Sequence, residues 1–169
     1  MIDDACKETW HVAYTRSKHE KIVAKTLRTR EIEIFLPTVK TMKIFSGKKR
    51  FVQLPLFPSY LFVKLENRQS YFDALEVPGI VSFVRNGKQL ATVSHELIDR
   101  LNAVTVDFTD RVEVSSEHFT KGDFVNITSG PFTGYLCEII DFKGKNKILV
   151  RIDVLQRSLL IDMPVRCLA

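Results

Sequence analysis

The chain has 169 residues, of which 45% are hydrophobic and 27% charged, and its formal net charge is +5; these values are typical of a globular protein with one domain or two small ones. It has no apolar run near the ~20 residues of a membrane helix, no secretory signal at its acidic start, and no Cys-x-x-Cys pair among its three cysteines. A cytoplasmic protein with neither a disulfide framework nor a zinc site is therefore expected.

The first part of the chain predicts a layered α+β domain. Trp10, Val12 and Tyr14 alternate along a first strand, and a helix follows with Ile22, Val23 and Leu27 on its apolar side. The further predicted elements are a strand over 33–36, a hairpin over 38–53, a strand over 59–65, a helix over 70–76, a strand over 80–85 and a helix over 94–104. This order predicts helices on an antiparallel sheet.

The strand over 59–65 is apolar on both of its faces. In Tyr60-Leu61-Phe62-Val63 one set of side chains faces the core beneath the helices, and the other set adds aromatic rings to the opposite face. Either a further layer of the same chain covers that face, or a partner docks on it. The sequence favours a partner, because no helix within the first 105 residues is left to cover it.

Positive charge is concentrated in residues 16–50, where eleven Lys and Arg and three Glu give +8. Lys21, Lys25 and Arg28 line the polar side of the predicted helix, and the hairpin has a basic tip at Lys48-Lys49-Arg50. Such asymmetry indicates an anionic partner such as nucleic acid, although a solvated basic face is an equal alternative on charge alone.

The second part of the chain predicts a small β-barrel. Residues 106–117 carry a net charge of −3 without periodicity and are interpreted as a linker. Short strands are predicted over 124–128, 135–142, 148–153 and 159–162, with turns between them. The expected domains are therefore 8–105 and 118–169.

Two motifs resemble the NusG family. The run Pro55-Leu-Phe-Pro-Ser-Tyr-Leu-Phe-Val63 is similar to the central motif of the NusG N-terminal (NGN) domain, and Lys121-Gly-Asp-Phe-Val-Asn-Ile127 with Gly130-Pro-Phe-Thr-Gly134 resembles the opening of a KOW domain. The resemblance implies a ferredoxin-like NGN domain followed by an SH3-like KOW barrel. Together with Gly79-Ile-Val-Ser-Phe-Val-Arg85, the first run is closer to the specialised antiterminators of the RfaH and UpxY kind.

This resemblance implies a binding protein that acts on RNA polymerase. In the family an aromatic concavity holds the clamp helices of the largest polymerase subunit, and a second segment touches the opposite lobe, which favours the closed, pause-resistant state. The matching clamp positions are Tyr14, Phe57, Tyr60, Phe62, Ile98 and Leu101, and the opposite-lobe positions are Ser70 and Phe72.

The resemblance also implies contacts with upstream or non-template DNA and with a partner of the KOW domain. The matching DNA positions are Lys21, Lys25, Thr26, Arg28, Thr29, Arg30, Lys48, Lys49 and Arg50. A ribosomal protein of the small subunit or Rho would contact a strand carrying Ile148, Val150, Ile152 and Val154, although each of these could equally be barrel core. Cys137 replaces the glycine that is usual in the family, and no reactive thiol is inferred.

Other classes fit less well. The four histidines have no ligand spacing, and no P-loop or Gly-x-Ser-x-Gly occurs, so no enzyme, metal or cofactor is predicted, and a monomer is expected. A ribosomal KOW protein would have a more basic second domain than the seven Lys and Arg against five Asp and Glu in 118–169. Within the family, a housekeeping NusG that works with Rho is the alternative to an operon-specific antiterminator.

Overall fold

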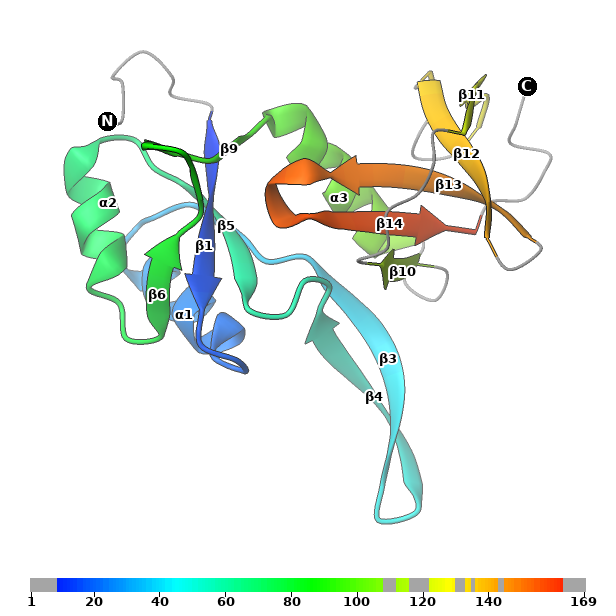
Figure 1. Ribbon diagram of the computed structural model, residues 1–169. Coiled ribbons are helices and arrows are strands. Elements are labelled where there is room, and N and C mark those ends of the chain that lie inside the picture. The colour runs from blue at the N-terminus through cyan, green and yellow to red at the C-terminus, as the bar shows by residue number, and fades with distance from the viewer. Residues whose placement is uncertain are drawn as a thin grey trace. The chain divides into compact units, whose positions relative to one another are not determined.

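The structure is a computed structural model that describes residues 9–107, 112–115, 122–129, 133–134, 136–142 and 145–162 (Figure 1). It divides into two compact units, Met1–Leu101 and Asn102–Ala169. The division falls inside the third helix, close to the end expected for the first domain. Each unit is described by itself.

An antiparallel sheet forms the centre of the first unit, as predicted. Its strand order is β2-β5-β1-β6, and β9 also pairs with β1. The strands are β1 (Trp10–Thr15), β2 (Ile34–Phe35), β5 (Tyr60–Lys64), β6 (Ile80–Phe83) and β9 (Thr92–Val93). In the register of β1 and β5, Tyr14 lies opposite Tyr60 and Val12 opposite Phe62. Because side chains alternate along a strand, these four residues share one face of the sheet.

Helices α1 (Glu20–Thr29) and α2 (Arg68–Leu75) lie on the other face of this sheet (Figure 1). The core there joins both helices to β1, β5 and β6, and it includes Ala13, Val23, Leu27, Leu61, Val63, Ala74 and Phe83. One prediction about α1 was wrong, since Ile22 is 59% exposed. The buried stripe of the helix is Glu20, Val23, Ala24 and Leu27, and Ile22 lies outside this i, i+3, i+4, i+7 set.

The predicted hairpin is confirmed as β3 (Thr38–Phe45) and β4 (Lys48–Pro55). Its two-residue turn, Ser46-Gly47, has positive φ at both residues (47° and 76°), as tight hairpin turns require. Figure 1 shows this ribbon extending away from the central sheet. A second, smaller hairpin is formed by β7 (Arg85–Asn86) and β8 (Gln89–Leu90).

Helix α3 (His95–Asp107) begins in the first unit. Trp10 Nε1 donates a hydrogen bond of 3.2 Å to His95 Nδ1, which ties the start of the helix to β1. Ser94 caps the helix, because its hydroxyl accepts a hydrogen bond from the backbone N–H of Leu97 at 3.3 Å. Ile98 and Leu101 are buried.

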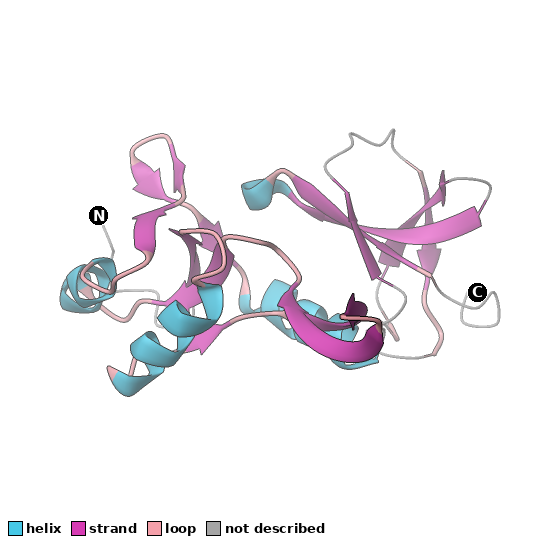
Figure 2. Ribbon diagram, turned by 90° about the horizontal axis from the view of Figure 1, so that it is seen from below, coloured by secondary structure: helices cyan, strands magenta, loops and turns pink. Residues whose placement is uncertain are grey.

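The second unit contains a five-stranded antiparallel sheet of order β10-β14-β13-β12-β11. Figure 2 draws its strands in magenta. Its elements are β10 (Val112–Ser115), β11 (Asp123–Asn126), β12 (Leu136–Phe142), β13 (Lys145–Ile152), η1 (Asp153–Leu155) and β14 (Arg157–Ile161). Gly122 is required before β11, because a Cβ there would lie 2.0 Å from the carbonyl oxygen of Ile139.

The segment expected as a linker, 106–117, contains regular structure. Residues 106 and 107 end α3, and Val112–Ser115 pairs with β14 in the second sheet. The remaining linker positions lie outside the described residues. The alternation Val112-Glu113-Val114-Ser115 is the strand signal, and the acidic composition around it obscured that signal.

The predicted α+β class is confirmed, with a layered first domain and a small all-β sheet after it. In the part of the chain that the structure describes, no helix has the length and apolarity needed to cross a membrane.

Candidate functional site

The aromatic face of the first sheet presents two tyrosines at its surface. The rings of Tyr14 on β1 and Tyr60 on β5 lie 5.3 Å apart between centroids at 51°. Tyr14 is 39% exposed and Tyr60 is half-buried. Two adjacent rings of this kind offer a large apolar area together with hydroxyl groups that can form hydrogen bonds, which is typical of a protein-binding surface.

Three phenylalanines form a second aromatic cluster. Phe62 contacts Phe57 edge to face at 6.4 Å and stacks on Phe35 at 6.0 Å. Phe57 is 2% exposed and Phe62 is fully buried, unlike the open hollow expected from the sequence. Ile98 and Leu101 are buried as well. Of the six positions expected to bind the clamp, only Tyr14 and Tyr60 can be touched without displacing other side chains.

A buried carboxylate fixes the turn that leads into β5. The backbone N–H of Ser59 donates a hydrogen bond of 2.7 Å to Glu20 Oε1, and Glu20 is buried in the first turn of α1. Ser59 has φ 68°, an uncommon left-handed conformation for a residue other than glycine. Its carbonyl oxygen accepts from the N–H of Thr15 at 2.8 Å, so Glu20 helps to position the ends of β1 and β5 that carry the tyrosine pair.

Ser70 and Phe72 lie on α2 and differ in their surroundings. Ser70 belongs to the cap of the helix: its N–H donates to Asn67 Oδ1 at 2.8 Å, and its hydroxyl donates to the Asn67 carbonyl oxygen at 2.8 Å. Phe72 is 44% exposed, and the guanidinium of Arg68 lies 5.6 Å from its ring centroid. Phe72 is therefore available to a partner, whereas Ser70 stabilises the helix.

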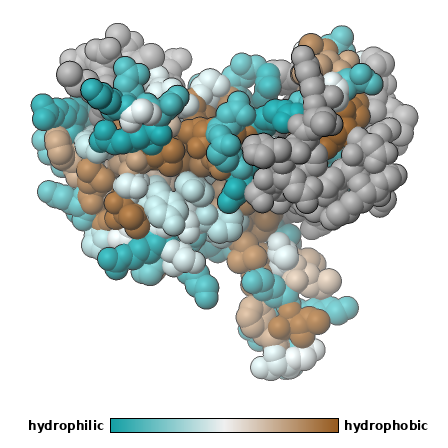
Figure 3. Space-filling view, viewed as in Figure 1, coloured by the Kyte–Doolittle hydropathy of each residue, from teal (hydrophilic) through white to brown (hydrophobic). Residues whose placement is uncertain are grey.

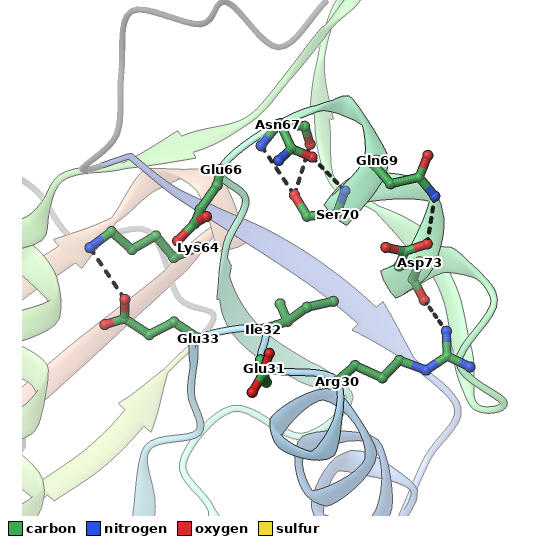
Figure 4. Close-up of a pocket in the computed structure, with 10 residues that line it drawn as sticks. All are labelled: Arg30, Glu31, Ile32, Glu33, Lys64, Glu66, Asn67, Gln69, Ser70 and Asp73. Atoms are coloured by element: carbon green, nitrogen blue, oxygen red, sulfur yellow. Dashed lines mark hydrogen bonds and ion pairs between the residues drawn. The ribbon is translucent and has the colours of Figure 1, made fainter.

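A polar cavity of about 180 Å³ lies between the end of α1 and the start of α2 (Figure 4). Several of the groups that line it are paired: Lys64 Nζ lies 3.3 Å from Glu33 Oε2, the Arg30 guanidinium donates to the Asp73 carbonyl oxygen at 2.6 Å, and the Gln69 amide donates to Asp73 Oδ1 at 2.7 Å.

His11 is the buried histidine of the first unit's described residues. Burial lowers the pKa of His11, so its ring is neutral at pH 7, and Nδ1 lies 3.3 Å from the carbonyl oxygen of Ala91. Among the residues that the structure describes, no group of three or more His, Cys, Asp and Glu side chains is placed to hold a metal ion.

The exposed basic face of α1 divides into two kinds of residue. Lys21 Nζ donates to the carbonyl oxygen of Gln53 on β4 at 2.6 Å, and Arg30 binds the Asp73 carbonyl and lies 3.8 Å from Glu76. Lys25 and Arg28 are exposed and make no side-chain hydrogen bond or ion pair with the described residues. These two side chains are thus the most available to an external anion.

The other expected nucleic-acid positions fall into two groups. Thr26 donates its hydroxyl proton to the Ile22 carbonyl at 3.0 Å, and Thr29 donates to the Thr26 carbonyl at 2.7 Å, so their methyl groups and oxygen lone pairs remain for a ligand. Lys48, Lys49 and Arg50 are exposed at the start of β4, next to the hairpin turn.

The strand expected to bind a KOW partner is mostly core in this structure. Ile148 and Ile152 are buried, Val154 is half-buried, and the side chain of Val150 lies outside the described residues. Cys137 on β12 is buried. The burial of Ile148 and Ile152 matches the barrel-core alternative for these two residues.

An ion pair between the buried Glu138 and the partly exposed Arg151, not predicted from the sequence, helps to join three segments of the second unit. Glu138 on β12 accepts from Arg151 Nε at 2.9 Å and Nη2 at 2.7 Å, and from the backbone N–H of Gly122 at 2.8 Å. The hydrogen bonds to Glu138 raise the pKa of Arg151. The sequence predicts β12 as a strand, but it does not predict that Glu138 on this strand is buried.

Comparison with known proteins places the chain in a family. The family model described as "NusG: Transcription termination factor nusG" matches residues 8–102. The transcription termination/antitermination protein NusG of Thermus thermophilus is 30% identical over 79% of this chain and 78% of that protein. The protein of the same name from Pasteurella multocida is 28% identical over 90% of both chains.

A solved structure described as "Domain interaction in Thermotoga maritima NusG" is 24% identical, covers 93% of this chain and 94% of that one, and has a TM-score of 0.51. This likeness supports the fold. The chain belongs to the NusG family of transcription termination and antitermination proteins.

Proposed function

We propose that this chain is a transcription elongation factor that binds RNA polymerase through its aromatic face and acts as an operon-specific antiterminator. The observation that carries the proposal is the ring pair of the exposed Tyr14 and the half-buried Tyr60 on a domain of the NusG family. Two ordered rings on a sheet present a preformed surface, so they lose little conformational entropy when a partner binds.

The polymerase partner is the helical hairpin of the clamp. A helix laid across the sheet would bury the tyrosine rings, and Phe57 and Phe62 would support the contact from within. Ile98 and Leu101 would take part only if α3 shifts, because both are buried. Phe72, next to Ser70 on α2, is the proposed contact with the opposite lobe. A ligand that bridges both sides favours the closed state and so suppresses pausing.

The proposed restriction to particular operons rests on the sequences of residues 55–63 and 79–85, which resemble those of the specialised antiterminators. Mapping the occupancy of the intact protein across the genome tests it. Occupancy limited to a few long transcription units is expected. Even coverage of most units would instead support the alternative, a housekeeping NusG-type factor that works with Rho.

DNA is the proposed ligand of the basic face, with Lys25 and Arg28 as its main phosphate contacts. Replacing both residues by Ala should reduce the slope of log affinity against log salt by about 1 to 2, because each phosphate contact contributes ~0.7 to 0.9. Fluorescence anisotropy with labelled DNA at several salt concentrations measures this slope.

The matched control also removes two positive charges, but from other positions in the first unit. Lys64 is paired with Glu33, and Lys88 lies in the turn between β7 and β8. The double variant Lys64→Ala with Lys88→Ala should keep the slope of the wild type. Equal slopes for the wild type and the Lys25/Arg28 variant would show that this face of α1 is merely solvated.

The second unit is proposed to bind a ribosomal protein of the small subunit or Rho. Among the expected contact residues, the half-buried Val154 reaches the surface; it lies within η1, directly after β13. Ile148 and Ile152 would act by supporting the sheet, because they are buried. No cofactor takes part in this scheme.

A further inference from the structure

The start of α3 is held on β1 by a hydrogen bond between a buried ring and an exposed one. Trp10 is 3% exposed, whereas the side chain of His95 is 53% exposed. Trp10 Nε1 donates to His95 Nδ1 at 3.2 Å, and an indole nitrogen can only donate. Figure 3 shows hydrophobic and hydrophilic residues next to one another on the surface of the first unit. The acceptor of this bond is therefore open to protons from the solvent, whereas its donor is shielded.

This hydrogen bond requires a neutral His95. Nδ1 accepts through its lone pair, so the neutral ring carries its proton on Nε2. Nε2 lies 3.7 Å from Asp99 Oδ2, one turn further along α3, where that proton faces a carboxylate. When Nδ1 also takes up a proton, it becomes a donor and has no lone pair left for the N–H of Trp10.

Protonation of His95 acts in opposite directions on its two contacts. The contact with Asp99 becomes an ion pair of opposite charges and is strengthened. The hydrogen bond with Trp10 is lost, which leaves a buried N–H donor unpaired, and an unpaired buried donor is costly. A positive charge in the first turn of a helix also opposes the helix dipole. The protonated ring therefore moves its pairing from Trp10 to Asp99.

The other charged groups close to this contact, in sequence or in strand register, occur as ion pairs. These are Lys64 with Glu33 at 3.3 Å and Glu96 with Arg100 at 2.6 Å. Lys64 belongs to β5, where it lies opposite Trp10 in the register. Because the two charges of each pair compensate each other, Asp99 has the main electrostatic effect on His95 among the described residues.

His11, the residue after Trp10, holds the segment that precedes α3. Its Nδ1 lies 3.3 Å from the carbonyl oxygen of Ala91, and β9 pairs with Trp10 and His11. Burial lowers the pKa of His11, so this ring stays neutral at a pH where an exposed histidine takes up a proton. The hold on Ala91 and β9 thus persists when the contact of His95 opens, and the change is confined to the start of α3.

We propose that His95 is a proton-operated latch for the start of α3. The neutral ring accepts the hydrogen bond from Trp10 and keeps the helix start on β1, whereas the protonated ring pairs with Asp99 and releases Trp10. A histidine side chain ordinarily changes charge between about pH 5 and 8, which sets the range in which the latch operates. This device goes beyond the proposed function, because it requires neither polymerase nor DNA.

NMR of the intact chain tests the latch, because Trp10 is the only tryptophan and gives a single indole N–H signal. As the pH falls from about 8 to about 5, this signal should move upfield and exchange faster with water, with the same midpoint as the ring protons of His95. The N–H of Ile98 donates to the Ser94 carbonyl at 3.3 Å in the turn that the latch holds. Its protection factor, corrected for intrinsic exchange, should fall about fivefold, as the loss of one hydrogen bond predicts.

Variants separate His95 from other titrating groups. His95→Gln keeps an acceptor oxygen that does not titrate, so the indole signal should stay constant over the same pH range. Asp99→Asn removes the partner of the protonated ring and should move the midpoint to lower pH. The matched control is His19→Gln at the N-cap of α1, where His19 Nδ1 lies 3.0 Å from the Ser17 carbonyl oxygen; it should leave the titration unchanged.

A constant indole signal in the wild type, or a transition that persists in His95→Gln, would overturn the proposal. So would an unchanged midpoint in Asp99→Asn. Loss of far-UV circular dichroism over the same pH range would also overturn it, because a whole domain would then unfold instead of one helix end being released.

Discussion

Replacing Tyr14 and Tyr60 together by Ala is expected to weaken binding to RNA polymerase by about two to three orders of magnitude. The two rings lie 5.3 Å apart at the surface, and buried aromatic anchors of interfaces cost about 2 kcal/mol or more each on truncation. Every 1.4 kcal/mol is a tenfold change in affinity. The loss can fall short of a simple sum, because neighbouring residues couple. Equilibrium titration of labelled protein with core polymerase measures it.

The control for this prediction is the double variant Tyr14→Phe with Tyr60→Phe, which keeps the rings and should retain most of the affinity. Circular dichroism checks that both variants are folded. Phe57→Ala would be a poor probe, because truncating a buried phenylalanine costs about 3–5 kcal/mol of stability and confuses folding with binding. Wild-type affinity in the double Ala variant would remove the aromatic face as the docking site.

Glu138→Ala is expected to destabilise the second unit by about 2–3 kcal/mol. The buried carboxylate accepts two hydrogen bonds from Arg151 and one from the N–H of Gly122, and hydrogen bonds to charged groups are the stronger ones. Arg151 is partly exposed and can be hydrated after the change, which keeps the loss below that of a fully buried pair. Urea unfolding of the intact chain, followed by near-UV and far-UV circular dichroism, measures the stability.

The chain offers a matched pair as the control. The exposed Glu96 forms an i, i+4 ion pair with the half-buried Arg100 on α3 at a distance of 2.6 Å. Glu96→Ala should change stability by about 0.5 kcal/mol or less. Similar losses for the two variants would mean that the Glu138 cluster contributes no more than an ordinary surface pair.

Much of the fold follows from local patterns. The alternation of Trp10, Val12 and Tyr14 predicts β1, and the run from Tyr60 to Val63 predicts a strand that is apolar on both faces. The Ser46-Gly47 turn between two polar, β-branched segments predicts the long hairpin. These signals depend on residues close in sequence, so they can be read before any tertiary contact is known.

Other features depend on contacts between distant residues. Glu20 resembles any acid in the first turn of a helix, and only the fold places it against the N–H of Ser59. Glu138 likewise depends on the register of β12 and β13, which brings Arg151 to it. The burial of Phe57 and Phe62 could not be predicted, because the same pattern fits an open hollow and a filled one.

The exposure of a segment is also hard to predict from composition. Ile22 was expected in the apolar stripe of α1 and is exposed, whereas the hairpin was expected to contribute only charge and exposes four large apolar side chains. Both cases arise because hydrophobicity does not specify which neighbours are within reach.

A competition experiment shows whether this chain docks on RNA polymerase through its aromatic face. Labelled full-length protein is bound to core polymerase without nucleic acid, and an isolated clamp-helix hairpin is titrated in. We expect a saturable complex that the hairpin displaces completely. If no complex forms, or if excess hairpin leaves the complex intact, the chain does not dock on the clamp helices through this face.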